Sequence, residues 1–359
     1  MLQAGLWVKD ARISSFDNLD YGVILNMAEE QSVVGLVAAG LEHLRDVHVP
    51  KQVVLRFVGQ ALQLEQSNKA MNEHVARLIE KLGESGVYSI LVKGQGIAQC
   101  YDNPFWRASG DIDLLLSDIN YEKAKQVLLP LALDVQKEYK TFKHLGMSMS
   151  DGYVVELHGT LHSRLSNRID NIIDEAQQDV FYGGNVRLWM NENTTVFLPA
   201  PDDDVIFIFT HILHHFFIDG IGLRQICDWC RLLWTYRSEI DTNLLEQRLK
   251  RAALMSEWKA FSAFAVEYLG MPLEAIPLYM PDKMWSRKAE RIMDYVLETG
   301  NLGHNRIVKW SDSRIVRKIQ SALKKMNDMC RLSRVFPLDS IKFFIHFISQ
   351  GIVSTIKGE

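Results

Sequence analysis

The chain has little of several features that would assign it to a class at once. Only four of its 359 residues are cysteines, too few and too scattered for a disulfide framework. Its formal net charge is −4, which gives no general attraction to nucleic acid. The longest apolar run, Val205 to Ile218, contains three histidines and falls short of the roughly 18 residues that a membrane span needs.

The first residues also lack the pattern of a secretory signal, because Lys9, Asp10 and Arg12 follow only a short apolar start. With thiols that we interpret as reduced, the expectation is a cytoplasmic protein. Hydrophobic residues make up 47% of the sequence and charged residues 23%, which is the balance of a globular chain that can bury a sizeable core. The length allows two or three domains.

Helical patterns dominate both ends of the chain. Apolar residues recur every three or four positions over 21–44 and 53–82 without a proline, which predicts helices. After Pro199-Ala-Pro201 almost everything has the same pattern, with Asp202 as a plausible helix cap. The predicted division is a helical N-terminal region at 1–85, a mixed core at 86–199 and a helical C-terminal region at 200–359.

The middle of the chain has a different composition. Short β-rich runs at 87–92 and 111–116 predict strands, and residues 121–133 read as a helix. Two hairpins are expected, one turning at Ser150-Asp-Gly152 and one around Asn191-Glu-Asn193. The predicted fold class is therefore α+β, with a small mixed sheet carried between two helical regions.

Two aspartates at the start of the second strand are the most informative residues. Asp111 and Asp113 follow Gly110, and residues i and i+2 of a strand point to the same face. Two carboxylates held that close repel each other unless a cation lies between them. Oxygen ligands of this kind suit magnesium, which usually binds through one or two carboxylates and substrate phosphates.

Glu156 is the best candidate for a third carboxylate. It lies in the middle of the apolar strand Val154-Val-Glu-Leu-His158, where an acid is costly to bury unless it is paired or bound to metal. Its hairpin is expected in the same sheet as Asp111 and Asp113. Together the three residues could hold two ions about 4 Å apart, as in phosphoryl displacement by two metals.

These residues stand in a series of motifs. The chain reads Leu91-Val-Lys93-Gly94, Arg107-Ala-Ser-Gly-Asp111-Ile-Asp113, Val155-Glu156-Leu-His158, Thr210-His-Ile-Leu-His-His215 and Leu223-Arg224-Gln-Ile-Cys-Asp228. The series resembles the polymerase-beta-like nucleotidyltransferase superfamily, and more closely a bacterial branch often called the uncharacterised nucleotidyltransferase family. The resemblance covers about residues 85 to 235 and implies a nucleotidyltransferase sheet in the core at 86–199. One departure from the superfamily is Gly94-Gln95, which lacks the Gly-Ser hydroxyl that often contacts the triphosphate.

The resemblance implies roles for the motif residues. Asp111 and Asp113 would be catalytic metal ligands, and Glu156 would complete the metal site or act as base on the acceptor hydroxyl. Lys93 with Gly94, and Arg107 with Gly110, would bind the nucleotide, the two cations pairing with its β- and γ-phosphates. For Lys93 and Arg107 the alternative is an ordinary salt bridge.

The later motif residues have two interpretations each. His158 could orient Glu156 or contact substrate, or it could be a hydrogen-bonded structural histidine. Arg224 could face the nucleotide, with Asp228 supporting the site, or the two could form an intrahelical pair four residues apart. A zinc site is a third idea for this region, from His211, His214, His215, Cys227 and Cys230, but their apolar neighbours fit packed helices better.

The function that the resemblance implies is magnesium-dependent transfer of a nucleoside monophosphate to an acceptor, with release of pyrophosphate. The donor would be a nucleoside triphosphate such as ATP, and two magnesium ions would be held by Asp111, Asp113 and Glu156. The acceptor stays open among a small molecule, a polysaccharide precursor, RNA and protein. Two alternatives stay open as well: a non-catalytic nucleotide-binding or regulatory descendant, and a toxin-like enzyme that modifies RNA or protein.

The last part of the chain is locally basic. Residues 306–334 hold nine Lys/Arg against two acids, and their spacing fits an amphipathic helix. The apolar tail Ile341–Ile348 that follows is too short to span a bilayer. The segment could make peripheral contact with an anionic membrane or hold an anionic acceptor, but we favour a tail that packs on the core, as long apolar tails usually do.

Overall fold

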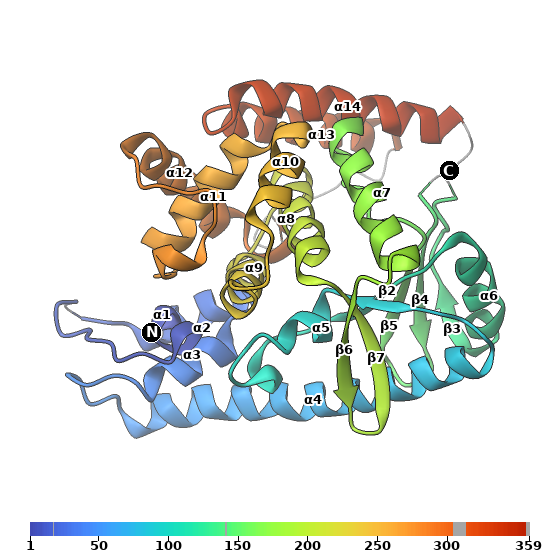
Figure 1. The fold of residues 1–359 in the computed structure, drawn as a ribbon. Coiled ribbons are helices and arrows are strands. Elements are labelled where there is room, and N and C mark those ends of the chain that lie inside the picture. Colours follow the sequence, from blue (N-terminus) through green and yellow to red (C-terminus); the bar gives the residue numbers. More distant parts are fainter. Residues whose placement is uncertain (17, 141, 304–313, 357–359) are drawn as a thin grey trace.

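The computed structural model describes residues 1–16, 18–140, 142–303 and 314–356. Its centre is a five-stranded sheet with the strand order β1-β2-β5-β4-β3. The strands are β1 (Ile90–Val92), β2 (Asp111–Leu115), β3 (Ala132–Val135), β4 (His144–Met149) and β5 (Val154–His158). Helices from both ends of the chain surround the sheet (Figure 1), so the predicted α+β class with helical terminal regions is confirmed.

The two central strands position the polar residues of the sheet. β2 and β5 run parallel, while the other neighbouring strands pair antiparallel. The apolar side chains of β2 and β5 are at most 1% exposed, namely Ile112, Leu114, Val155 and Leu157. Because side chains alternate along a strand, this burial on one face leaves the intervening polar residues together on the other face.

Both predicted hairpins are confirmed. β4 and β5 pair across the turn at 150–152. The second hairpin, β6 (Val186–Asn191) and β7 (Thr194–Pro199), forms a separate two-stranded sheet, and β7 packs against β1 and α4 (Lys51–Glu84).

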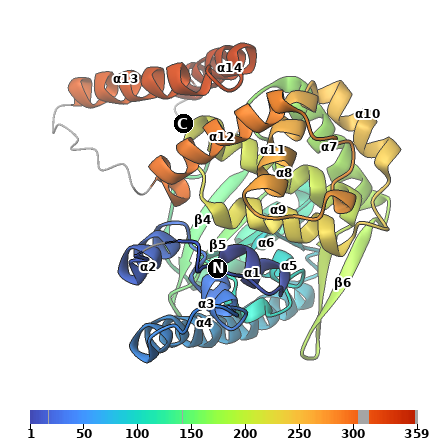
Figure 2. The same ribbon diagram turned by 90° about the vertical axis from the view of Figure 1, so that its left-hand side faces the viewer.

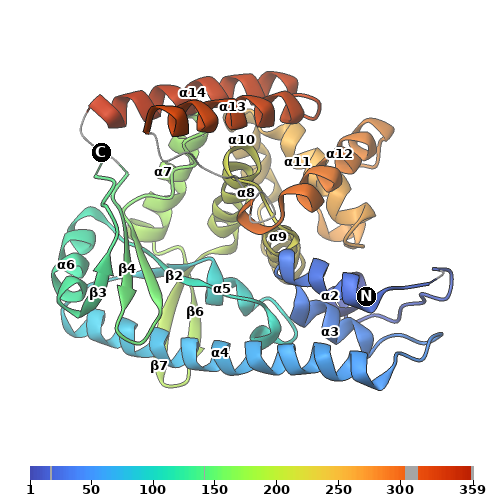
Figure 3. The same cartoon turned by 180° about the vertical axis from the view of Figure 1, so that it is seen from behind.

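The helices before the sheet are α1 (Leu2–Trp7), α2 (Tyr21–Glu30), α3 (Val34–Leu41) and α4 (Lys51–Glu84). The single helix predicted over 21–44 is thus two helices. Ser32 between them has φ of 55°, a left-handed conformation that cannot continue a right-handed helix. α4 passes beneath the central sheet (Figure 3).

The helices of the middle region are α5 (Gly94–Ala98), α6 (Asp118–Leu128) and α7 (Asn167–Tyr182). The helix predicted over 121–133 runs too far, because α6 ends at Leu128. Pro130 follows in a short 3₁₀ turn, since proline cannot donate the next helical hydrogen bond. Residues 132–135 then form the edge strand β3.

The C-terminal helices are α8 (Pro201–Ile218), α9 (Leu223–Thr235), α10 (Thr242–Ala252), α11 (Met255–Glu267), α12 (Lys283–Thr299), α13 (Arg314–Leu332) and α14 (Pro337–Ile356). The prediction that Asp202 caps α8 is wrong. The cap position is Ala200, because Pro201 occupies the first helical position, where its fixed φ favours helix initiation. Asp202 instead accepts a hydrogen bond from the backbone of Asp241 (2.7 Å).

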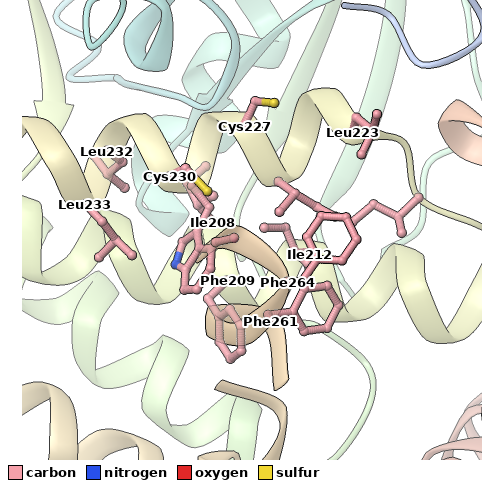
Figure 4. Close-up of a cluster of buried hydrophobic side chains, with 14 of the residues drawn as sticks. Ile208, Phe209, Ile212, Leu223, Cys227, Cys230, Leu232, Leu233, Phe261 and Phe264 are labelled. Atoms are coloured by element: carbon pink, nitrogen blue, oxygen red, sulfur yellow. The ribbon is translucent and has the colours of Figure 1, made fainter. Parts of the chain in front are cut away.

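One hydrophobic cluster joins all three predicted regions. It includes Leu36 from α3, Ile90 from β1 and Phe209 from α8. Cys227 and Cys230 of α9 lie in the same cluster among leucine, isoleucine and phenylalanine side chains (Figure 4). Burial raises the pKa of both thiols, which disfavours the thiolate that zinc needs. The packed-helix interpretation of these cysteines therefore fits their surroundings.

The last two helices lie across one end of the molecule, side by side (Figures 1 and 2). Phe343 of α14 packs on Phe217 of α8, with ring centroids 4.8 Å apart. Lys325 of α13 donates to the carbonyl of Ile218 (3.1 Å). Residues 304–313, which include the start of the basic segment, lie outside the described residues. Among the residues that are described, no helix has the length and hydropathy to cross a bilayer.

Candidate active site

The structure brings the three predicted carboxylates together on one face of the sheet. Asp113 of β2 lies directly opposite Glu156 of β5, and Asp111 lies two residues before Asp113. One oxygen from each can be chosen so that all lie within 4.8 Å of one another. The parallel pairing of β2 and β5 is therefore the feature that assembles the group.

The long helix α4 fixes where β2 begins. Asn68, which is 2% exposed, donates to the carbonyls of Phe105 (2.7 Å) and Arg107 (2.8 Å) and also contacts the Ser109 hydroxyl. Since buried polar groups need partners, this single amide holds the loop that leads to Asp111.

Lys93 lies at the end of β1, in an uncommon backbone conformation. Its φ is 57°, which costs of the order of 1–3 kcal/mol for a residue with a side chain and persists only where the surroundings impose it. Its Nζ is 3.0 Å from Asp113 Oδ1. Burial alone would lower the pKa of Lys93, but Asp113, Asp111 and Glu156 outweigh it and hold the pKa above its ordinary value.

Gly94 and Gln95 follow Lys93 at the start of α5. Gly94 has φ of 35°, and an added Cβ would lie 3.4 Å from the carbonyl oxygen of Asp111. The Gln95 side chain donates hydrogen bonds to Asn72 Oδ1 (2.7 Å) and to the Asn68 carbonyl (3.3 Å), both on α4. The residue that replaces the usual serine therefore holds α5 against α4.

Two histidines of the sheet contact the carboxylates of Asp113 and Glu156. His158 Nε2 is 2.7 Å from Asp113 Oδ1 and 3.4 Å from Glu156 Oε2, and His144 Nε2 is 3.2 Å from Glu156 Oε2. Burial alone would raise the pKa of Glu156, but these contacts with both imidazoles outweigh it and lower the pKa. His158 thus supports both carboxylates of the opposed pair.

The charges of the group favour a bound cation. Repulsion from Asp113, and then burial, raise the pKa of Asp111. Burial alone would raise the pKa of Asp113 as well, but Lys93 and His158 outweigh it and lower the pKa. Lys93 therefore compensates mainly Asp113, and Asp111 is the carboxylate that most needs a further positive charge.

Arg107 and Asp228 form an ion pair, which is the alternative considered for Arg107 in the sequence. The Arg107 guanidinium meets the Asp228 carboxylate at two points (3.1 and 2.6 Å), and the Tyr101 hydroxyl donates to the same carboxylate (2.8 Å). The intrahelical pair considered for Arg224 and Asp228 is therefore replaced by an ion pair that ties the loop before β2 to α9.

Arg224 lines the cleft together with Lys93 and Arg107. Its Nη1 donates to the carbonyl of Ala108 (3.1 Å), and its buried Nε has no hydrogen-bond partner within the described part of the chain. A buried guanidinium nitrogen without a partner is costly. Arg224 and Asp111 line the same cleft, which encloses about 590 Å³.

A second pocket of about 220 Å³ adjoins this cleft and shares Lys93, Glu156, His211 and His215 with it. His144, His158 and His214 also line the second pocket. Burial, and then the charge of Lys93, keep the pKa of His211 well below its ordinary value. Burial and His215 lower the pKa of His214 to about 4. Imidazole is therefore the main polar group of this pocket.

His144 and Asn301 belong to the site but were not predicted from the sequence. The predicted hairpin carried the signal, because pairing across the turn at 150–152 places His144 directly opposite His158. Asn301, at the edge of the cleft, carried no such signal. It joins the site through Ser32 (2.9 Å) and Gln225 (2.8 Å), which lie far from it in the sequence.

Comparison with known proteins gives one match. The model of a family described as uncharacterised nucleotidyltransferase matches residues 17–270, which include the whole central sheet, α8 and α9. No curated protein and no solved structure matches the chain.

Proposed function

Because the chain belongs to the uncharacterised nucleotidyltransferase family, we propose that it transfers a nucleoside monophosphate from a nucleoside triphosphate such as ATP to an acceptor, with magnesium, in the cytoplasm. The acceptor oxygen would form a bond to the α-phosphorus, and the bond from that phosphorus to the bridging oxygen would break. Pyrophosphate would leave, and the acceptor proton would pass to Glu156 or to water. The proposal includes membership of the wider polymerase-beta-like superfamily.

The observation that carries the proposal is the opposition of Asp113 and Glu156 on parallel strands, with Asp111 beside them. Carboxylate oxygens are the hard donors that magnesium prefers, so this donor set fits the ion. Asp111, Asp113 and Glu156 would hold two ions. When bound, the ions would neutralise phosphate charge and align the attacking and leaving oxygens.

Arg224 and Lys93 are the proposed phosphate ligands. The unpartnered Nε of Arg224 would gain a partner from a phosphate oxygen in the cleft, and its guanidinium suits two-point contact. Lys93 would contribute a point charge while it stays close to Asp113 (3.0 Å). Gly94 and Gly110 both line the cleft, and neither has a side chain to hinder the backbone's approach to nucleotide.

For Arg107 we propose a positioning role rather than direct phosphate contact. Both of its contacting nitrogens are occupied by Asp228, and such a pair is costly to separate. His158 would position Asp113 and Glu156 in the same indirect way.

We also propose that α14 makes peripheral contact with an anionic membrane. Leu338, Ile341, Ile345 and Ile348 recur at helical spacing and are 44% to 68% exposed. The adjacent α13 carries six Lys/Arg against one acid in its sequence. An exposed apolar stripe beside a basic helix is the pattern of an interfacial surface.

The decisive experiment is a transfer assay with magnesium and each of four labelled nucleoside triphosphates against fractions of cell extract. Transfer of label by the natural chain, and none by an Asp113→Asn chain, would support the proposal. Tight nucleotide binding without transfer to any fraction would instead favour a non-catalytic nucleotide-binding protein. Label on RNA or protein together with growth arrest on expression would favour the toxin-like enzyme.

A further inference from the structure

Three side chains that line the second pocket form a second group, which shares Glu156 with the three carboxylates. His144 on β4 lies opposite His158 on β5, and Glu156 lies two residues before His158. All three therefore project from the same face of the sheet. One ligand atom from each can be chosen so that all lie within 4.8 Å of one another, and all three line the second pocket.

The two distances from Glu156 to the imidazoles match the spacing of ligands around one ion. Glu156 Oε2 is 3.2 Å from His144 Nε2 and 3.4 Å from His158 Nε2. Ligands placed about 2.0–2.1 Å from a tetrahedral ion are separated by roughly 3.3–3.4 Å. Asp113 Oδ1, which is 2.7 Å from His158 Nε2, is a further oxygen donor beside the group. Two imidazoles and a carboxylate leave at least one position of such an ion open.

We propose that His144, Glu156 and His158 bind a borderline divalent metal ion, of which Zn²⁺ is the prime candidate, with an open coordination position facing the histidine-lined pocket. Imidazole nitrogen suits zinc and other late transition metals, whereas magnesium prefers oxygen ligands throughout. The site is thus chemically distinct from the group of Asp111, Asp113 and Glu156. It does not depend on nucleotidyl transfer, because the ligands converge in the protein without any substrate.

Glu156 belongs to both groups and couples them. Its Oε2 lies within 3.4 Å of a nitrogen of both imidazoles, and its side chain also lines the nucleotide cleft. A metal ion at the imidazole group therefore engages the carboxylate that the nucleotide cleft also needs. Imidazole binds a metal ion only in its neutral form, so Co²⁺ binding should weaken at acidic pH.

The test uses Co²⁺ as a visible substitute for Zn²⁺, added to the full chain after chelator treatment and without nucleotide. The natural chain should bind one equivalent, with an absorption band that Zn²⁺ removes and excess Mg²⁺ does not. His144→Ala should weaken Co²⁺ binding by about tenfold or more. His144→Asn, checked for an unchanged circular dichroism spectrum, repeats the measurement with a polar side chain.

Two further variants locate the ion. Asp111→Asn removes a carboxylate of the other group and should leave the Co²⁺ band in place. His215→Ala alters a pocket histidine that belongs to a different group, with His214 and Asp219, and should also leave it. Unchanged binding by both His144 variants, loss of the band in Asp111→Asn or His215→Ala, or displacement by Mg²⁺ at equal concentration would each overturn the proposal. None of these outcomes depends on whether the protein transfers nucleotides.

Discussion

Arg107 and Asp228, which are 121 positions apart in the sequence, form a buried two-point ion pair. The side chains are 6% and 7% exposed, and Tyr101 donates to the same carboxylate. The pair joins the loop before β2 to α9, so it positions Asp111 and Arg224 relative to each other across the cleft.

The first prediction separates Arg107 from Arg224. Arg107→Ala leaves Asp228 buried without its cation, and breaking such a pair costs about 3–5 kcal/mol, so thermal stability should fall sharply. Arg224→Ala removes a guanidinium whose hydrogen bond among the described residues is to the Ala108 carbonyl, so stability should change much less. Affinity for a non-hydrolysable triphosphate should nevertheless fall about tenfold or more, as befits a charge-assisted contact. Thermal melting and calorimetric titration measure the two effects.

Arg107→Lys is the matched control, because it keeps the charge and loses the two-point geometry. It should be less stable than the natural chain but should still bind triphosphate. Triphosphate binding that is unchanged in Arg224→Ala and lost in a folded Arg107→Lys would reverse the two assigned roles.

The sequence could predict the elements that depend on local signals. The hairpin turning at Ser150–Gly152 and the apolar strand around Glu156 were both recognisable, and together they bring Glu156 toward Asp113. The three- and four-residue spacing of apolar residues also predicted the helical regions at both ends of the chain. It missed the break between α2 and α3, because the left-handed conformation of Ser32 is not encoded by a glycine.

The partners of the site residues could not be predicted in the same way. Asp228 lies four residues from Arg224, and local spacing favoured a pair between them. The observed pair joins Arg107, in the loop before β2, to Asp228 on α9, which is a tertiary contact. His144 had a local signal in the hairpin register, whereas the contact of Asn301 with Ser32 had none.

The second prediction concerns the two aspartates. Asp111→Asn and Asp113→Asn should both abolish magnesium-dependent transfer, but they should change stability in opposite directions. Repulsion and burial raise the pKa of Asp111, so its charge destabilises the folded state and Asn should stabilise it. The pKa of Asp113 is lowered, so its charge is favourable, and Asn would deprive Lys93 and His158 of their partner.

Urea unfolding of both variants at neutral pH without metal measures this contrast. Full transfer activity in either variant would refute the metal role of that residue. Equal stability shifts in the two variants would contradict the charge distribution described for the site.

The third prediction concerns Lys93. Lys93→Ala should weaken binding of nucleoside triphosphate more than binding of nucleoside monophosphate, because its proposed contact is with the outer phosphates. Calorimetric titration with both nucleotides gives the two affinities. Lys143→Ala is a control for loss of charge, since Lys143 pairs with Asp118 (2.6 Å) outside the cleft. An equal loss for both nucleotides would mean that Lys93 acts through the structure of the site.

The fourth prediction is a pH dependence of stability that Glu257 of α11 controls. Its side chain is fully buried, and it lies next to the carboxyl group of Asp339. Burial, and then the charge of Asp339, raise the pKa of Glu257 to about 8. The folded state therefore holds a proton that the unfolded state releases near pH 4.3.

The proton on Glu257 therefore stabilises the folded state fully below about pH 4.3. As the pH rises from there toward 8, the free energy of unfolding falls by up to about 1.4 kcal/mol per pH unit. Glu257→Gln should remove this loss, so the variant should exceed the natural chain in stability most clearly at pH 8. Urea unfolding at pH 5, 6.5 and 8 tests it, with the exposed Glu290→Gln as control. A constant difference between Glu257→Gln and the natural chain at all three pH values would rule out this titration.

The fifth prediction concerns the exposed stripe of α14. Ile341 and Ile345 are 47% and 62% exposed, so Ile341→Asp together with Ile345→Asp should leave the fold intact. The double variant should lose co-sedimentation with anionic vesicles at low salt, because both the apolar burial and the charge attraction decrease. Charge reversal at Arg317, Lys318 and Lys324 should weaken binding in a salt-dependent way. Lys325 is left unchanged because it donates a hydrogen bond to the Ile218 carbonyl.

Neutral vesicles provide the control, and failure of the natural chain to bind anionic vesicles at low salt would remove the membrane interpretation. If the natural chain binds but the isoleucine variant binds equally well, the basic helix alone accounts for the contact.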